Sequence, residues 1–174
     1  MDVMKDSSHD SAKKSESVTL DGIDLRLLDR LQVDAALTND ALAALVHISP
    51  ATCLRRVKRL VERGVIERRV ALVAAEKFGP SLTAIVEVTL DRQGSEAQAA
   101  FEARAVAEPA VLQCHRVSPG PDFVLTVQVA DMPAYHALVQ RLFTEDANVR
   151  NVKSFFSIHR AKFDTRVPLP AAAP

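Results

Sequence analysis

The sequence predicts an α+β chain. It has an N-terminal helix-turn-helix domain of the winged-helix type and a C-terminal βαββαβ sandwich domain of the ferredoxin-like type. Two observations carry this prediction. Three short amphipathic helical patterns fill the first third of the chain, and strand-like and helical patterns then follow in the order β-α-β-β-α-β. We expect a disordered polar arm over 1–17, a helix-turn-helix domain over 18–64, a strand and hinge linker over 65–80, a sandwich domain over 81–165 and a flexible tail over 166–174.

The N-terminal helices are marked by residues that favour helix ends. Residues 20–35 form one apolar stripe at three- and four-residue spacing, which is typical of an amphipathic helix. Thr38 can cap a second, short helix, and Ser49 with Pro50 can begin a third. Gly64 then ends the third helix. Two helices joined by a short turn at this spacing predict a helix-turn-helix.

The third helix is expected to bury one side and to present polar and basic residues on the other. The expected buried stripe is Leu54, Val57, Leu60 and Val61. The N-terminal part of such a helix enters the major groove of DNA. The candidates nearest the bases are therefore Ser49, Ala51, Thr52 and Arg55, because arginine can hold guanine with two hydrogen bonds.

The charge distribution supports a polyanion site at this helix. Net charge is zero over 174 residues, but residues 49–80 carry eight basic and three acidic side chains, a net charge of +5. A local positive segment indicates a local anionic partner. The expected phosphate contacts are Arg56, Lys58, Arg59, Arg68 and Arg69.

The rest of the chain predicts a linker and then the sandwich. Residues 65–73 look like a strand, and 74–80 look like a hinge. The four expected sandwich strands are 82–90, 111–117, 122–129 and 149–159. The two expected helices are 95–107 and 132–143. No apolar run approaches the ~20 residues of a membrane span, and the start lacks a secretory signal, so we expect a cytoplasmic protein without a membrane partner.

Metal binding and catalysis find little support in the sequence. Cys114 and His115 are neighbours on a predicted strand, so their side chains point to opposite faces and chelate poorly together. No nucleophile elbow and no phosphate-binding loop is present. We therefore expect no cofactor, no metal and no enzyme activity. An RNA-binding βαββαβ module would need exposed sheet aromatics, and the only such stretch, at Phe155 and Phe156, lacks the basic-aromatic pattern.

Two segments resemble the Lrp/AsnC family, the leucine-responsive and feast/famine regulators. The family segment LSPxxCxRRVxxLExxGxI is similar to ISPATCLRRVKRLVERGVI at 48–66, and DMxAYxxL is similar to DMPAYHAL at 131–138. The resemblance covers roughly residues 20–165. It implies a regulator that binds double-stranded DNA and assembles as a homodimer or a higher homo-oligomer, up to an octamer.

The resemblance also implies an amino-acid effector bound near the turn before the third sandwich strand, at an interface between dimers. The implied effector residues are Ser118, Gly120, Asp122, Met132, Phe156 and Ser157. The family commonly reads V-S-G-x-x-D at this turn, whereas this chain has Pro119 at the usual glycine position. Since proline lacks an N–H and fixes φ, this departure implies a different effector or none. Three alternatives stay open: a ligand-independent DNA-binding or architectural protein, an amino-acid-binding enzyme, and an RNA-binding protein.

Overall fold

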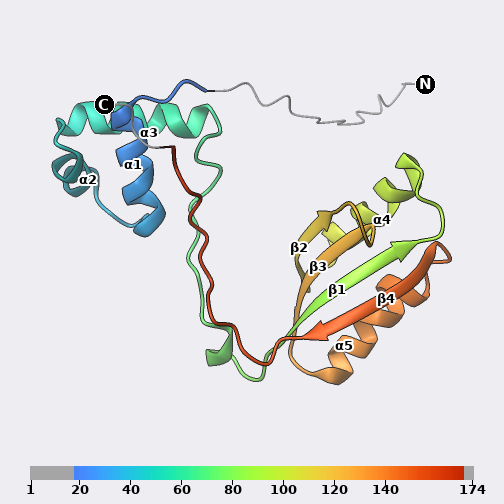
Figure 1. Cartoon of the computed structure of the whole chain (residues 1–174). Coiled ribbons are helices and arrows are strands. Elements are labelled where there is room, and N and C mark those ends of the chain that lie inside the picture. Colours follow the sequence, from blue (N-terminus) through green and yellow to red (C-terminus); the bar gives the residue numbers. More distant parts are fainter. Residues whose placement is uncertain (1–17, 171–174) are drawn as a thin grey trace, which may run out of the picture. The chain divides into compact units, whose positions relative to one another are not determined.

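The structure, a computed structural model, describes residues 18–170 and divides the chain into two compact units (Figure 1). Within the described residues, the first unit comprises 18–71 and 164–170, and the second comprises 72–163. The first unit is therefore formed by two separate stretches of the chain. The arm expected over 1–17 lies outside the described residues, as do residues 171–174 of the expected tail. No helix over 18–170 is long and apolar enough to cross a membrane.

The first unit contains three helices whose ends follow the sequence signals. They are α1 (Gly22–Val33), α2 (Asn39–Val46) and α3 (Pro50–Glu62). The side chain of Thr38 accepts a hydrogen bond from the backbone N–H of Ala41, and that of Ser49 accepts one from the N–H of Thr52. Both caps confirm the predicted helix starts.

The core of the first unit differs from the expected stripe on α3. Cys53, Val57 and Leu60 are buried, whereas Leu54 and Val61 are 61% and 47% exposed. The prediction of Leu54 and Val61 as buried was wrong, because the apolar side of α3 is rotated toward Cys53. Cys53 and Val57 pack in one buried cluster with Leu27, Leu42, Ala43 and Val46.

Residues 65–73 do not form the expected strand. Along 65–74 the structure assigns no strand, and a short 3-10 helix, η1 (Ala75–Lys77), follows. An alternating pattern forms a strand only where a neighbouring strand supplies hydrogen bonds, and the described residues supply none here. This segment leaves Val70, Leu72, Val73 and Phe78 exposed.

The second unit is a four-stranded antiparallel sheet in the order β2-β3-β1-β4. Its strands are β1 (Leu82–Leu90), β2 (Val111–Arg116), β3 (Phe123–Val129) and β4 (Val149–Phe156). Its helices are α4 (Ser95–Ala107) and α5 (Met132–Val139), and a π-helical turn, η2 (Gln140–Thr144), continues α5. This order and pairing confirm the ferredoxin-like sandwich.

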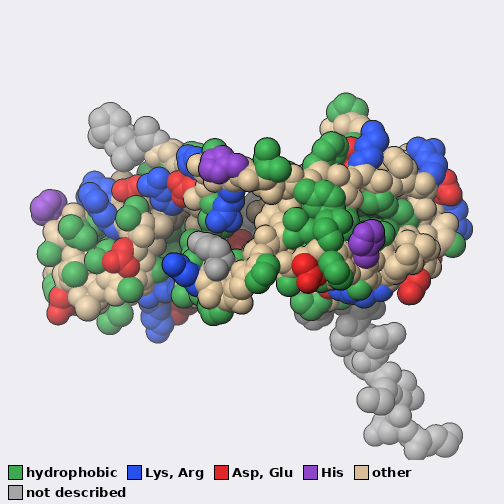
Figure 2. Space-filling model, turned by 90° about the horizontal axis from the view of Figure 1, so that it is seen from below, with side chains coloured by type: hydrophobic (Ala, Val, Ile, Leu, Met, Phe, Trp, Pro, Cys, Tyr) green, Lys and Arg blue, Asp and Glu red, His purple; other side chains and the backbone are tan. Residues whose placement is uncertain are grey.

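Both helices of the second unit cover the same face of the sheet (Figure 1). Phe101 of α4 and Leu138 of α5 pack in one buried cluster with Val86 of β1 and Leu125 of β3. Figure 2 shows further hydrophobic side chains on the surface of this unit. Ile85 and Phe155, which pair across β1 and β4, are 45% and 53% exposed. The face of the sheet opposite the helices therefore carries uncovered apolar area.

Part of the segment expected as a flexible tail contacts the first unit. The backbone N–H of Val167 donates to Oε1 of Gln32 at 2.6 Å, and Nε2 of Gln32 donates to the carbonyl oxygen of Val167 at 3.2 Å. Leu169 is partly buried. Residues near 167 thus pack along α1 and belong to the first unit.

Replacing Gln32 with alanine removes both hydrogen bonds to Val167. We expect faster hydrogen exchange at the Val167 amide and a loss of about 1 kcal/mol or less in the unfolding free energy, because each bond is exposed to solvent. Exchange measured by NMR checks this, with Gln140→Ala, an exposed glutamine of the other unit, as the control. Unchanged exchange at Val167 in Gln32→Ala would contradict the contact.

Candidate nucleic-acid interface and ligand site

The turn between α2 and α3 fixes the direction of α3. His47 has φ 59° and ψ 50°, in the left-handed region, and is the only described residue other than glycine with positive φ. The backbone N–H of Ile48 donates to the carbonyl oxygen of Ala43 at 3.0 Å, and its side chain packs against the core. This bond closes α2, and α3 begins two residues later.

Replacing His47 with glycine should stabilise the protein. A left-handed conformation costs a residue with a Cβ about 1–2 kcal/mol, and glycine avoids most of this cost but loses more backbone entropy on folding. We expect a gain of up to about 1 kcal/mol in unfolding free energy for His47→Gly and a loss for His47→Val. Urea denaturation of both variants measures this, and a glycine variant less stable than the valine variant would refute the argument.

The first two turns of α3 present the exposed residues of the candidate nucleic-acid interface. Ser49 caps the helix, and its Oγ also donates to Oγ1 of Thr52 at 2.9 Å. Ala51, Arg55 and Lys58 are exposed on the side of α3 opposite the buried Cys53. The first turn of α3 contains no acidic residue. A helix N-terminus with exposed donors and positive charge suits an anionic partner.

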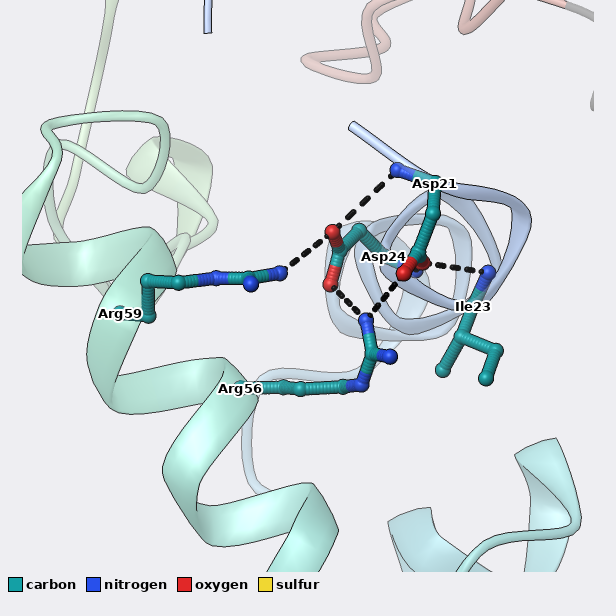
Figure 3. A network of polar contacts seen from close by, with 5 residues as sticks. All are labelled: Asp21, Ile23, Asp24, Arg56 and Arg59. Carbon is teal, nitrogen blue, oxygen red and sulfur yellow. Dashed lines mark hydrogen bonds and ion pairs between the residues drawn. The ribbon is translucent and has the colours of Figure 1, made fainter. Parts of the chain in front are cut away.

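Arg56 and Arg59 point in a different direction from Arg55. Their guanidinium groups reach the first turn of α1, where they bind the buried carboxylate of Asp24 (Figure 3). Nη1 of Arg56 lies 2.9 Å from Oδ1 of Asp24 and 2.6 Å from Oδ2 of Asp21, and Nη2 of Arg59 lies 2.6 Å from Oδ2 of Asp24. The structure therefore separates these two arginines from the exposed basic residues with which the sequence grouped them.

The side chains of this network are partly buried. The side chain of Asp24 is 1% exposed and that of Arg56 is 18% exposed, whereas that of Arg59 is 41% exposed. Hydrogen bonds from the backbone N–H of Asp24 and from Arg56 lower the pKa of Asp21. The two carboxylates in turn raise the pKa of Arg56. Asp21 and Arg56 are thus both charged at neutral pH, and the network joins α3 to α1.

Sequence reasoning interpreted Asp24 only as a negative charge that suits a helix start. A stronger signal was available, because Asp24 lies three and four residues before Leu27 and Leu28 and thus on the apolar stripe of α1. A carboxylate on a buried stripe needs a charged or hydrogen-bonding partner. The partner itself could not be identified from the sequence, since many arginines were available.

Arg68, Arg69 and Lys58 are exposed in the structure. Lys58 forms a weak ion pair with Glu62 one turn later, at 3.7 Å between Nζ and Oε1. Arg68 and Arg69 lie in the extended segment that follows α3. These three side chains are therefore accessible to a nucleic-acid backbone.

A hollow of about 500 Å³ in the second unit contains three of the six predicted effector residues. Ser118, Gly120 and Asp122 line it. The other lining residues are Gln93, Gln98, Arg116, Val117 and Pro121. The hollow is thus mostly polar, with amide, hydroxyl and guanidinium groups at its wall.

Asp122 has a structural role at the wall of this hollow. Its side chain is buried, and Oδ2 accepts hydrogen bonds from the backbone N–H of Leu90 at 2.7 Å and from Nε2 of Gln93 at 3.3 Å. The backbone N–H of Val117 donates to the carbonyl oxygen of Asp122 and closes the turn over 118–121. Asp122 therefore holds the segment after β1 against this turn.

Met132, Phe156 and Ser157 lie at the other end of the sheet. Phe156 pairs with Ala84 on β1, whereas Phe123, next to Asp122, pairs with Val88. Four residues of strand separate these positions by roughly 13 Å. Met132 is 41% exposed, and the ring of Phe156 contacts Tyr135 at a centroid distance of 5.0 Å. Within one chain the six predicted residues thus form two separate groups.

Comparison with known proteins agrees with both units. Residues 20–67 match a winged helix-turn-helix DNA-binding model, and residues 83–167 match the Lrp/AsnC ligand-binding domain. A leucine-responsive regulatory protein of Rhizobium meliloti is 37% identical over 83% of this chain and 93% of its own. The DNA-binding transcriptional activator DecR of Escherichia coli is 35% identical over 86% of this chain and 99% of its own.

Solved structures show the same arrangement of elements. A transcriptional regulator of Neisseria meningitidis, solved as a complex with L-Met, superposes with a TM-score of 0.80 at 31% identity and covers 86% of this chain and 97% of that one. An AsnC family regulator of Agrobacterium tumefaciens superposes with a TM-score of 0.81 at 32% identity, with the same coverage. The chain belongs to the Lrp/AsnC family of transcriptional regulators, with a helix-turn-helix for DNA and a ligand-binding sandwich domain.

Proposed function

We propose that this regulator reads double-stranded DNA through the outward side of α3, defined by Ser49, Ala51, Thr52, Arg55 and Lys58. The observation that carries this proposal is the orientation of α3, which buries Cys53 and leaves Arg55 exposed. Arg55 reads a base edge, and Lys58, Arg68 and Arg69 contact phosphates. Mobility shifts with a duplex selected from a random pool test the proposal, since an absence of sequence preference would contradict it.

Arg56 and Arg59 act on this interface indirectly. Their bonds to Asp24 stabilise the packing of α3 on α1, so they determine how α3 is presented. Arg59 is 41% exposed and retains donors for a phosphate, whereas Arg56 is enclosed. We therefore assign Arg56 to the orientation of α3 and not to phosphate binding.

An amino-acid effector is the proposed ligand of the hollow at Ser118, Gly120 and Asp122. The guanidinium of Arg116 and the amide of Gln98 line it and can donate to an α-carboxylate, and the carboxylate of Asp122 can accept from an α-ammonium. The relative solved with L-Met supports a ligand of this kind. Because Met132, Phe156 and Ser157 lie elsewhere in the chain, they would reach the same ligand from a neighbouring subunit.

Replacing Asp122 with asparagine should separate effector binding from DNA binding. The asparagine Oδ1 can still accept from the N–H of Leu90, but the negative charge beside the ligand is lost. We expect DNA affinity to stay within about twofold while effector affinity falls on the order of tenfold, the loss of one charge-assisted hydrogen bond.

A thermal-shift screen of the twenty amino acids first identifies the effector, since a ligand of the native state raises its stability. Asp91→Asn is the matched control, because Asp91 is exposed and lies just after β1. Equal effector affinity in Asp122→Asn and Asp91→Asn would exclude the proposed ammonium contact. No shift with any amino acid would favour a ligand-independent regulator.

We propose that copies of this chain associate through the uncovered sheet face of the second unit. Ile85, Leu112 and Phe155 are 45%, 57% and 53% exposed, and apolar area of this kind is typical of subunit interfaces. We propose a homodimer or a higher homo-oligomer that binds a two-fold symmetric DNA site. Sedimentation of the wild type and of Phe155→Glu tests this, because the charge should shift the population toward monomer.

A further inference from the structure

One large apolar side chain is exposed among the outward residues of α3. Leu54 is 61% exposed, although its neighbour Cys53 is fully buried. On a helix, residues three and four apart lie on the same side, so Leu54 lies beside Ala51 and Lys58. The first two turns of α3 thus present a small apolar surface next to the exposed Arg55.

The surroundings of Leu54 limit what this apolar surface can contact. Arg55 and Lys58 are exposed beside it, and the first turn of α3 has no acidic residue. Arg56 and Arg59 are turned away to Asp24. The surface around Leu54 is therefore positive as well as apolar, which suits DNA better than the apolar face of another protein.

The major groove offers one apolar group to such a surface. Each thymine carries a C5-methyl group there, and apolar side chains contact it in DNA complexes. A leucine beside an arginine that reads guanine can therefore distinguish a neighbouring A·T pair from a G·C pair. Burial of a methyl group against leucine is worth about 0.8 kcal/mol, roughly a fourfold change in affinity.

We propose that Leu54 is a specificity-determining residue of α3 and contacts the C5-methyl group of a thymine next to the base pair read by Arg55. This inference rests on the proposed DNA interface. It adds a residue that sequence reasoning assigned to the core, and it names the chemical group that the residue recognises.

Uracil substitution tests the proposal directly, because uracil lacks only the methyl group of thymine. Each thymine of the selected duplex is replaced in turn, and the affinity is measured by mobility shift. We expect the wild type to lose roughly threefold to tenfold at one position of each half-site, in line with one buried methyl group. Leu54→Ala should bind the thymine and uracil duplexes equally at that position.

Val61→Ala is the matched control, because Val61 is also an exposed apolar residue of α3 but lies two turns farther from its N-terminus. This variant should keep the uracil penalty of the wild type. A wild type that is indifferent to uracil at every position, or a Leu54→Ala variant that keeps the penalty, overturns the proposal.

Three outcomes distinguish a failure of the role of Leu54 from a failure of the proposed DNA interface. If the wild type prefers no duplex sequence, the proposed DNA readout itself fails, together with the role of Leu54. If it prefers a sequence but tolerates every uracil, only the role of Leu54 fails. If Leu54→Ala dissociates the oligomer in sedimentation and the wild type tolerates uracil, Leu54 is a contact between subunits and the proposal is wrong.

Discussion

Asp24→Ala should destabilise the helix-turn-helix unit more than any surface substitution on α1. The change removes a buried carboxylate that accepts from Nη1 of Arg56, from Nη2 of Arg59 and from the backbone N–H of Asp21. Both guanidinium groups then lose their enclosed partner. Breaking a buried ion pair costs about 3–5 kcal/mol, and partial exposure of the arginines reduces this to about 2–4 kcal/mol.

Chemical denaturation of the full chain measures this loss, and Asp29→Ala is the control because Asp29 is an exposed carboxylate of the same helix. The control should change the unfolding free energy by less than about 0.5 kcal/mol. A double variant, Asp24→Leu with Arg56→Leu, should regain part of the stability, since apolar residues often replace a buried pair without loss. An Asp24→Ala variant as stable as Asp29→Ala would show that the network contributes little.

Arg55→Ala should have the largest effect on sequence recognition. The guanidinium of Arg55 is exposed and engaged in no ion pair among the described residues, so it is available to hold guanine O6 and N7. Its removal should weaken specific binding by about 1–3 kcal/mol and relax the preference at one base pair of each half-site. Stability should change little, because the side chain does not contribute to the core.

7-Deazaguanine locates the contact of Arg55, because it replaces only the N7 acceptor of guanine by carbon. At one guanine of each half-site the wild type should lose affinity, and Arg55→Ala should be indifferent to the replacement. Lys58→Ala serves as the comparison, since a phosphate contact does not depend on N7. If the wild type tolerates the replacement at every guanine, Arg55 does not contact guanine N7 and the assignment is wrong.

The sequence predicted the fold closely because local signals agreed with the tertiary structure. Thr38 and Ser49 cap α2 and α3 as expected, and the helix over 95–107 has the same bounds as α4. These features depend on hydrogen bonds within a few residues. The strand expected over 65–73 was wrong, because a strand depends on a partner that local sequence does not specify.

The orientation of the candidate site residues could be predicted less well than the fold for a related reason. Arg55, Arg56 and Arg59 are chemically alike, and only the packing of α3 on α1 separates the exposed one from the two that bind Asp24. Leu54 and Cys53 are adjacent apolar residues, and the rotation of α3 decides which is buried. Rotating a helix about its axis by one residue position, about 100°, exchanges core and surface residues. In a helix of this length, sequence periodicity determines that rotation poorly.

We propose that Arg55, on the outward side of α3, supplies sequence specificity, whereas Lys58, Arg68 and Arg69 supply only affinity. The most direct test is the ratio of affinities for the selected duplex and for an unrelated duplex of equal length at one salt concentration. We predict that this ratio falls on the order of tenfold or more in Arg55→Ala. In Arg69→Ala both affinities should fall together and the ratio should stay unchanged, because phosphate contacts carry no sequence information. An unchanged ratio in Arg55→Ala, or a ratio that falls equally in both variants, would contradict the account.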